Sequence, residues 1–141
     1  RVRWDALGGT TYLLQVGGFF GDTGNLVLNL LEGPPPVLEA FTIDGASVNA
    51  KTGVVTLRTT VTCSETGGFV FVEASLRQRV GRRIIRGFGF AEIECAGPTP
   101  VTLEVEGENG LFVAGRATVE AVACSDEECL EATATVRMRG H

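Results

Sequence analysis

The sequence predicts an all-β protein whose main body is an antiparallel β-sandwich. Apolar residues alternate with polar ones along most of the chain, and glycine-rich turns separate the alternating runs. No stretch shows the 3.6-residue period of an amphipathic helix. Seven or eight short strands of this kind are typical of two packed antiparallel sheets.

Three consecutive prolines at residues 34–36 divide the chain into unequal parts. Proline fixes an extended backbone and donates no hydrogen bond, so this run stops a strand and acts as a stiff spacer. We therefore predict an N-terminal β-hairpin in residues 1–33, a proline linker at 34–36 and the β-sandwich in residues 37–141.

The N-terminal part contains two apolar runs on either side of a turn rich in glycine. Alternate positions in these runs form one apolar face, which consists of Tyr12, Leu14, Val16, Leu26, Leu28 and Leu30. Leu13, Val27 and Leu31 make the reverse face apolar too, which is typical of a sheet buried on both sides. Because an isolated hairpin is marginally stable, we expect this one to pack on the rest of the chain or on a neighbouring molecule.

Beyond the prolines, a strand is predicted over residues 37–43, with a turn at Asp44-Gly45. Further strands are predicted over residues 55–63, 69–80, 82–95, 101–106, 117–124 and 132–138. A hairpin joins the second and third of these at residues 80–82. Apolar side chains occupy even-numbered positions at Phe88 and Phe90 and odd-numbered positions at Ile93 and Cys95. This change of face predicts a bulge near Ala91.

An immunoglobulin-like topology is our first choice for this set of strands, with the N-terminal hairpin as an extension. The single tryptophan, Trp4, lies outside the segment between the cysteines. We therefore expect a structural relative of that fold that lacks the buried tryptophan of antibody domains.

The four cysteines, Cys63, Cys95, Cys124 and Cys129, allow three disulfide pairings. Their positions favour Cys63–Cys95, at the ends of two predicted strands, and Cys124–Cys129, around a short loop. A zinc site is the alternative, although the chain has no C-x2-C pair and its only histidine is His141. Disulfides imply an oxidising location, so we expect the protein outside the cell or on its surface.

Composition limits the remaining classes of function. The formal charge of −5 argues against general attraction to nucleic acid or to an anionic membrane, and no apolar run approaches the about 20 residues that span a bilayer. The 44% hydrophobic content predicts a packed core. Since the sequence starts at Arg1, we expect a processed chain or a piece of a longer one.

The sequence contains no convincing catalytic, cofactor or metal site. One terminal histidine does not supply the base of a triad, and Glu104 with Glu106 on one strand face is more typical of solvated side chains. Residues 125–128 are acidic, and the predicted hairpin turn holds Asp22 and Asn25. Neither segment has the D-x-D-x-D-G spacing of a calcium loop.

One segment concentrates positive charge: Arg77, Arg79, Arg82, Arg83 and Arg86 lie within ten residues. It can be a solvated hairpin tip whose charge discourages edge aggregation. It can also bind a glycan or another polyanion. A third interpretation is that it contacts acidic patches at residues 104–108 and 126–131 of a neighbouring subunit in a head-to-tail contact.

Two family resemblances follow from local motifs. The segments VTCS at 61–64, LRQRVGR at 76–82, GRATV at 115–119 and ATATVR at 132–137 resemble a family of uncharacterised secreted bacterial immunoglobulin-like domains. That resemblance covers residues 37–141 and implies two cysteine pairs in sequence order, but no activity. Residues 6–31 resemble the closing strands of the bacterial pre-peptidase C-terminal domain.

These observations favour a non-enzymatic structural subunit of an extracellular assembly or surface filament. The hairpin would add its strands to an adjacent subunit, giving head-to-tail self-association. The alternative is an accessory spacer or glycan-binding module of a larger secreted protein. Neither hypothesis involves a cofactor, a nucleic acid or a membrane span.

Overall fold

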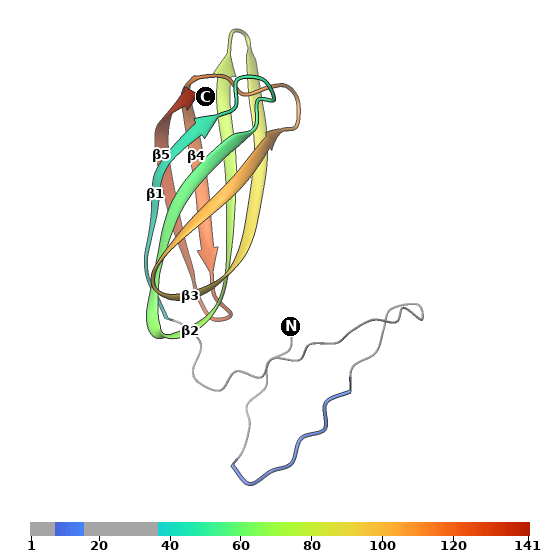
Figure 1. Cartoon of the computed structure of the whole chain (residues 1–141), viewed down its shortest axis with the longest axis vertical. Helices are drawn as coiled ribbons and strands as arrows, with labels where there is room; N and C mark the ends of the chain where they lie inside the picture. The colour runs from blue at the N-terminus through green and yellow to red at the C-terminus, as the bar shows by residue number, and fades with distance from the viewer. Residues whose placement is uncertain (1–7, 16–36) are drawn as a thin grey trace. The chain divides into compact units, whose positions relative to one another are not determined.

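A computed structural model describes residues 8–15 and 37–141, and backbone contacts divide the chain into two compact units, residues 1–31 and 32–141 (Figure 1). Residues 8 and 9 form a turn, and residues 10–15 carry neither helix nor strand. The remainder of the predicted hairpin, including Val16, Leu26, Leu28 and Leu30, lies outside the described residues, as does the proline linker.

The second unit consists of five strands, of which two are unusually long. These are β1 (Leu38–Val48), β2 (Val55–Val80), β3 (Arg83–Gly107), β4 (Gly115–Cys124) and β5 (Cys129–Gly140). The described part of the chain contains no helix, and thus none that could cross a membrane, so the predicted all-β class is confirmed. The expectation of seven or eight short strands is wrong, because β2 and β3 each continue through segments predicted as turns.

All five strands belong to one sheet in the order β1-β5-β4-β2-β3, and β1 also pairs with β2. The sheet therefore closes on itself: β2 pairs with β1 through residues 55–63 and with β4 through residues 71–77. Every pairing is antiparallel except a short parallel one, in which Ser47 and Val48 pair with Arg139 and Gly140. The two separate sheets of an immunoglobulin-like sandwich are not confirmed.

The closed sheet has two sections that meet at a bend in β2 and β3. The β1 section comprises β1 with residues 55–63 of β2 and 97–105 of β3; the β4 section comprises residues 68–80 of β2 and 83–95 of β3 with β4 and β5. The β2–β3 register shifts at the bend, between Cys63 and Gly68. In Figure 1 the bend lies at the lower end of the strands, and the β2–β3 hairpin tip at the upper end.

The predicted disulfides both form. Cys63 and Cys95 are buried, with Cα atoms 5.9 Å apart, and they join the two sections at the bend. Cys124 and Cys129 close the β4–β5 hairpin, where they are also cross-strand partners. No cysteine is free.

The core of this unit follows the period-two pattern of the strands. Valine is its commonest residue, as suits a pleated buried surface. Its fully buried large side chains are Phe112, Leu57, Leu76, Leu103, Met138, Val48, Val55, Val61, Val70, Val72, Val105 and Val119. The one buried amide, that of Gln78, donates to the Val113 carbonyl at 2.8 Å and accepts the Val113 N–H at 3.0 Å, which holds the β3–β4 connection against β2.

Three local predictions can be compared with the structure. The hairpin at residues 80–82 is confirmed: Val80 pairs with Arg83, and Gly81 has a φ of 60°. The predicted turn at Asp44-Gly45 is wrong, since β1 continues there with a register shift between Ile43 and Gly45. The predicted bulge near Ala91 is also wrong, because the β2–β3 register is unbroken from Cys95 to Arg83.

Candidate functional site

The outer surface of the β4 section is the most distinctive part of the described molecule. Its strands lie in the order β3, β2, β4, β5, and the register aligns their outward side chains in rows. One row holds Phe88, Ser75, Glu120 and Thr133, and the next row towards the hairpin tip holds Arg86, Arg77, Thr118 and Thr135. Side chains far apart in the sequence thus become neighbours on one surface.

Two inward-facing glycines explain why aromatic side chains lie on this outer surface. Gly87 and Gly89 are buried, and a Cβ on either residue would come within 3 Å of a backbone carbonyl oxygen of β3, that of Glu106 or Glu104 respectively. Because only glycine permits this close approach, the inward series continues without a bulge. Phe88 and Phe90 then point outwards and remain 52% and 58% exposed.

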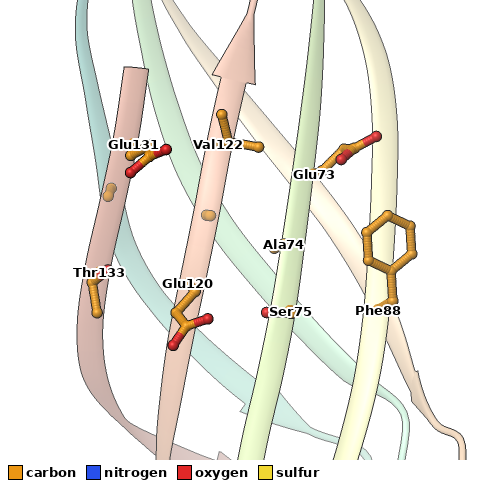
Figure 2. Close-up of a pocket in the computed structure, with 10 residues that line it drawn as sticks. Glu73, Ala74, Ser75, Phe88, Glu120, Val122, Glu131 and Thr133 are labelled. Carbon is orange, nitrogen blue, oxygen red and sulfur yellow. The ribbon is translucent and has the colours of Figure 1, made fainter. Parts of the chain in front are cut away.

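A shallow trough of about 350 Å³ crosses this surface. Figure 2 shows Glu73, Glu120 and Glu131 projecting from β2, β4 and β5, with Phe88 on β3 at one side. Hydroxyl groups of Ser75 and Thr133 complete its polar lining. Since several carboxylates and an exposed aromatic ring lie on one open surface, the trough suits a cationic or polar partner.

The end of the same surface near the hairpin tip is basic. Outward positions on the four strands carry Arg77, Arg79, Arg86, Arg116, Arg137 and Arg139, and the tip adds Arg82 and Arg83. The predicted arginine cluster is therefore larger than its sequence segment, because β4 and β5 contribute three further guanidinium groups. Such a concentration of one charge attracts anionic groups.

The end of the surface that carries Glu73, Glu120 and Glu131 is the acidic end. It meets the basic end in the middle of the surface. There the Arg77 guanidinium lies 3.9 Å from the Glu120 carboxylate, and both side chains are about half exposed, at 56% and 53%. Exposed ion pairs of this kind contribute little to stability. This ion pair therefore contributes little to the stability of the single chain.

The carboxylate pair and the possible metal sites considered from the sequence show no special arrangement among the described residues. Glu104 and Glu106 are exposed on β3. In the part of the chain that the structure describes, no group of three or more His, Cys, Asp or Glu side chains is placed to hold a metal ion.

The acidic loop at residues 125–128 has a structural contact. Glu128 Oε1 accepts a hydrogen bond from the Leu38 N–H at 2.7 Å, and the Glu128 carbonyl accepts one from the Ser125 N–H at 2.9 Å. The loop therefore joins the β4–β5 hairpin to the first residue of β1.

Of the six residues predicted to form a subunit interface, two are described. Tyr12 and Leu14 are exposed, and so is Leu13 between them. The other four, Val16, Leu26, Leu28 and Leu30, lie outside the described residues.

The trough and the full extent of the basic end were missed from the sequence. Glu73 and Glu120 are isolated in the chain and Glu131 ends the acidic segment at 126–131, and only the register of three strands brings the three carboxylates together. One signal was present: residues 85, 87, 89, 91, 93 and 95 form an unbroken period-two series if the glycines are placed inside.

Comparison with known proteins identifies a family but no activity. A search of the curated proteins finds no match. Among solved structures, a crystal structure of the Bifidobacterium adolescentis GH3 beta-glucosidase aligns with 17% identity and a TM-score of 0.36. The alignment covers 69% of this chain, which spans only 17% of that enzyme. Residues 37–134 match the model of a family of unknown function, DUF6299. The chain therefore belongs to the DUF6299 family.

Proposed function

We propose that the chain is a non-catalytic structural subunit of an extracellular assembly. In this proposal the N-terminal segment of one copy adds as extended backbone to a sheet of the next copy. Successive head-to-tail contacts of this kind do not close and would propagate into a filament.

The observation that carries the proposal is that the core cluster of the described residues lies within the strand-rich unit. Every member of the core cluster lies between Leu38 and Met138. Residues 8–15 contribute none of it, although they include the exposed Leu13 and Leu14. The core therefore gives no role to Leu13 and Leu14, and strand addition would supply one.

The spacing of these exposed residues suits strand addition. In an added strand, Tyr12 and Leu14 would lie on one face and Leu13, which is 95% exposed, on the other. Backbone hydrogen bonds would supply affinity, and alternate side chains would fill apolar pockets. Val16, Leu26, Leu28 and Leu30 would extend the same pattern.

Two disulfides support the extracellular part of the proposal. All four cysteines are paired, which is typical of proteins from oxidising compartments. The proposal accordingly places the assembly outside the cell or on its surface.

The test compares the full chain with a double variant, Tyr12→Ser/Leu14→Ser, by negative-stain electron microscopy and size-exclusion chromatography with light scattering. We expect filaments or a ladder of oligomers from the non-reduced wild type and their loss in the variant. Thr11→Ser serves as the matched control, because it changes a neighbouring polar position. Filaments that persist in the double variant would refute strand addition by this segment.

A wild-type chain without filaments or a ladder of oligomers would favour the alternative, an accessory spacer or glycan-binding module of a larger secreted protein. Loss of glycan binding on changing Arg82, Arg83 and Arg86 to glutamate would then assign binding to the hairpin tip.

A further inference from the structure

We propose that the outer surface of the β4 section is a self-complementary interface, which packs against the same surface of a second copy. The two copies would be related by a twofold axis that lies in the plane of the contact. This axis runs at right angles to the strands, between the row of Ser75 and the row of Arg77. This isologous contact uses none of the N-terminal residues of the proposed strand addition, and does not depend on it.

The first argument comes from β2. A twofold axis midway between Ser75 and Arg77 exchanges Glu73 with Arg79 of the other copy. Both side chains point outwards and are exposed. The contact therefore brings together two carboxylate–guanidinium pairs, one on each side of the axis.

The second argument is that β5 repeats this arrangement at the same level. The register places Ser75 beside Glu120 and Thr133, and Arg77 beside Thr118 and Thr135. An axis between Thr133 and Thr135 exchanges Glu131 with Arg137 of the second copy. Two strands that are distant in the sequence thus have opposite charges at matching distances from one axis.

The third argument comes from β3, where the same axis lies between Arg86 and Phe88. It places the Arg86 guanidinium over the exposed Phe88 ring of the other copy, which is a favourable cation–π arrangement. It also places Phe90 against Ile84, and both are more than half exposed in the single chain. The apolar side chains of this surface would thereby be removed from water.

The direction of the axis follows from the charge distribution. An axis parallel to the strands would place the acidic end on the acidic end and the basic end on the basic end. Like charges at close range oppose association, whereas the perpendicular axis places each end over its opposite. A twofold contact of this second kind closes, so it predicts a dimer.

The charges concerned are too far apart to satisfy one another within one chain. Glu73 and Arg79 are six residues apart on one strand, or about 20 Å at ~3.3 Å per residue. The only ion pair found between the two ends among the described residues is the contact of Arg77 with Glu120 at 3.9 Å. Arg79 Nε donates a hydrogen bond to the Gly81 carbonyl at 3.3 Å, which leaves the two terminal nitrogens of its guanidinium for a carboxylate of the second copy.

The dimensions of the surface suit a modest dimer. Four strands about 4.8 Å apart and nine residues at about 3.3 Å give about 600 Å² per copy, near the lower end of specific interfaces. Twisted sheets pack at about 30° to each other, which moves the outer rows sideways by about one strand spacing. The length of an arginine side chain spans that displacement.

The test is a charge exchange, carried out in the full chain with Tyr12→Ser/Leu14→Ser so that strand addition does not contribute. Sedimentation velocity would give the dimer dissociation constant of this background, of Glu73→Arg, of Arg79→Glu and of an equimolar mixture of the two variants. We expect each single variant to raise the dissociation constant at least tenfold. The mixture should form a heterodimer at nearly the background affinity, because the arginine introduced in one chain then faces the glutamate introduced in the other.

Charge-matched controls lie on the other section of the sheet: Glu104→Arg and Arg58→Glu are exposed there and should leave dimerisation unchanged. Recovery in the mixture separates a direct contact from a folding defect, which mixing would not repair. A monomeric background chain, or single variants that dimerise as the background does, would overturn the proposal. A mixture that stays monomeric would overturn the proposed pairing of Glu73 with Arg79.

Discussion

The outer surfaces of the two sections are built from different kinds of residue. On the β1 section, Thr42 and Thr60 donate hydrogen bonds to the Asp44 carboxylate at 3.0 and 2.7 Å, so neighbouring side chains satisfy one another. On the β4 section, aromatic rings and carboxylates gather near the bend and arginines near the tip. A solvated sheet face needs polar side chains alone, whereas the proposed dimer would use the sorting of charge along the β4 section.

Below these surfaces, three contacts join the sections. They are the Cys63–Cys95 disulfide, the close approach of Gly87 to Val105 and Glu106 at the other end of β3, and the hydrogen bond from the Leu38 N–H to the Glu128 carboxylate. Weakening each contact in turn measures how far the β4 section depends on the β1 section. The expected losses of stability fall in the order in which the contacts are taken below.

The largest effect is expected from removing the disulfide at the bend. The double variant Cys63→Ala/Cys95→Ala opens a loop with a sequence separation of 32, for which chain entropy gives about 4 kcal/mol. The matched variant Cys124→Ala/Cys129→Ala, with a separation of 5, should lose about 2 kcal/mol. Urea unfolding measures both, and equal losses would show that the bend is held by packing and not by its cross-link.

The next effect is expected at Gly87. In Gly87→Ala the new Cβ would collide with the Glu106 carbonyl oxygen, which is backbone and cannot rotate away. We expect a loss of about 3 kcal/mol from overpacking. Gly140→Ala is the matched control, since its Cβ would meet nothing closer than 3.9 Å. A Gly87→Ala variant as stable as this control would contradict the close approach of the two sections.

A smaller effect is expected at the loop that contacts β1. Glu128→Ala removes the acceptor of the Leu38 N–H and should cost about 1 kcal/mol. Hydrogen exchange at the Leu38 amide should accelerate in this variant and stay unchanged in Glu127→Ala. Unchanged exchange in both would mean that the loop does not hold the start of β1.

The smallest effect on folding is expected from Phe90→Ser, on the outer surface of the β4 section. Because Phe90 is 58% exposed, the variant should change the free energy of unfolding by less than about 1 kcal/mol. It should nevertheless weaken dimerisation, whereas Thr102→Ser on the other section should change neither quantity. A large loss of stability would mean that the Phe90 side chain stabilises the fold, which would contradict its assignment to the dimer contact alone.

Local sequence was sufficient for much of this fold. Alternation predicts strands because side chains of a strand point to opposite faces, and the turn at residues 80–82 needs only a glycine with positive φ. Both disulfides were anticipated from the positions of the cysteines relative to those strands. The family match over residues 37–134 agrees with the predicted resemblance to an uncharacterised family.

The sequence by itself therefore determined an all-β chain with two disulfides and a basic hairpin tip. Only the tertiary structure decided that Gly87 and Gly89 face inwards, because that choice depends on where another part of β3 passes. It also decided which charges become neighbours, since the register of β4 and β5 against β2 aligns residues more than 40 positions apart. Period-two patterning fixes the face on which a side chain lies, but its neighbours across the sheet depend on long-range pairing.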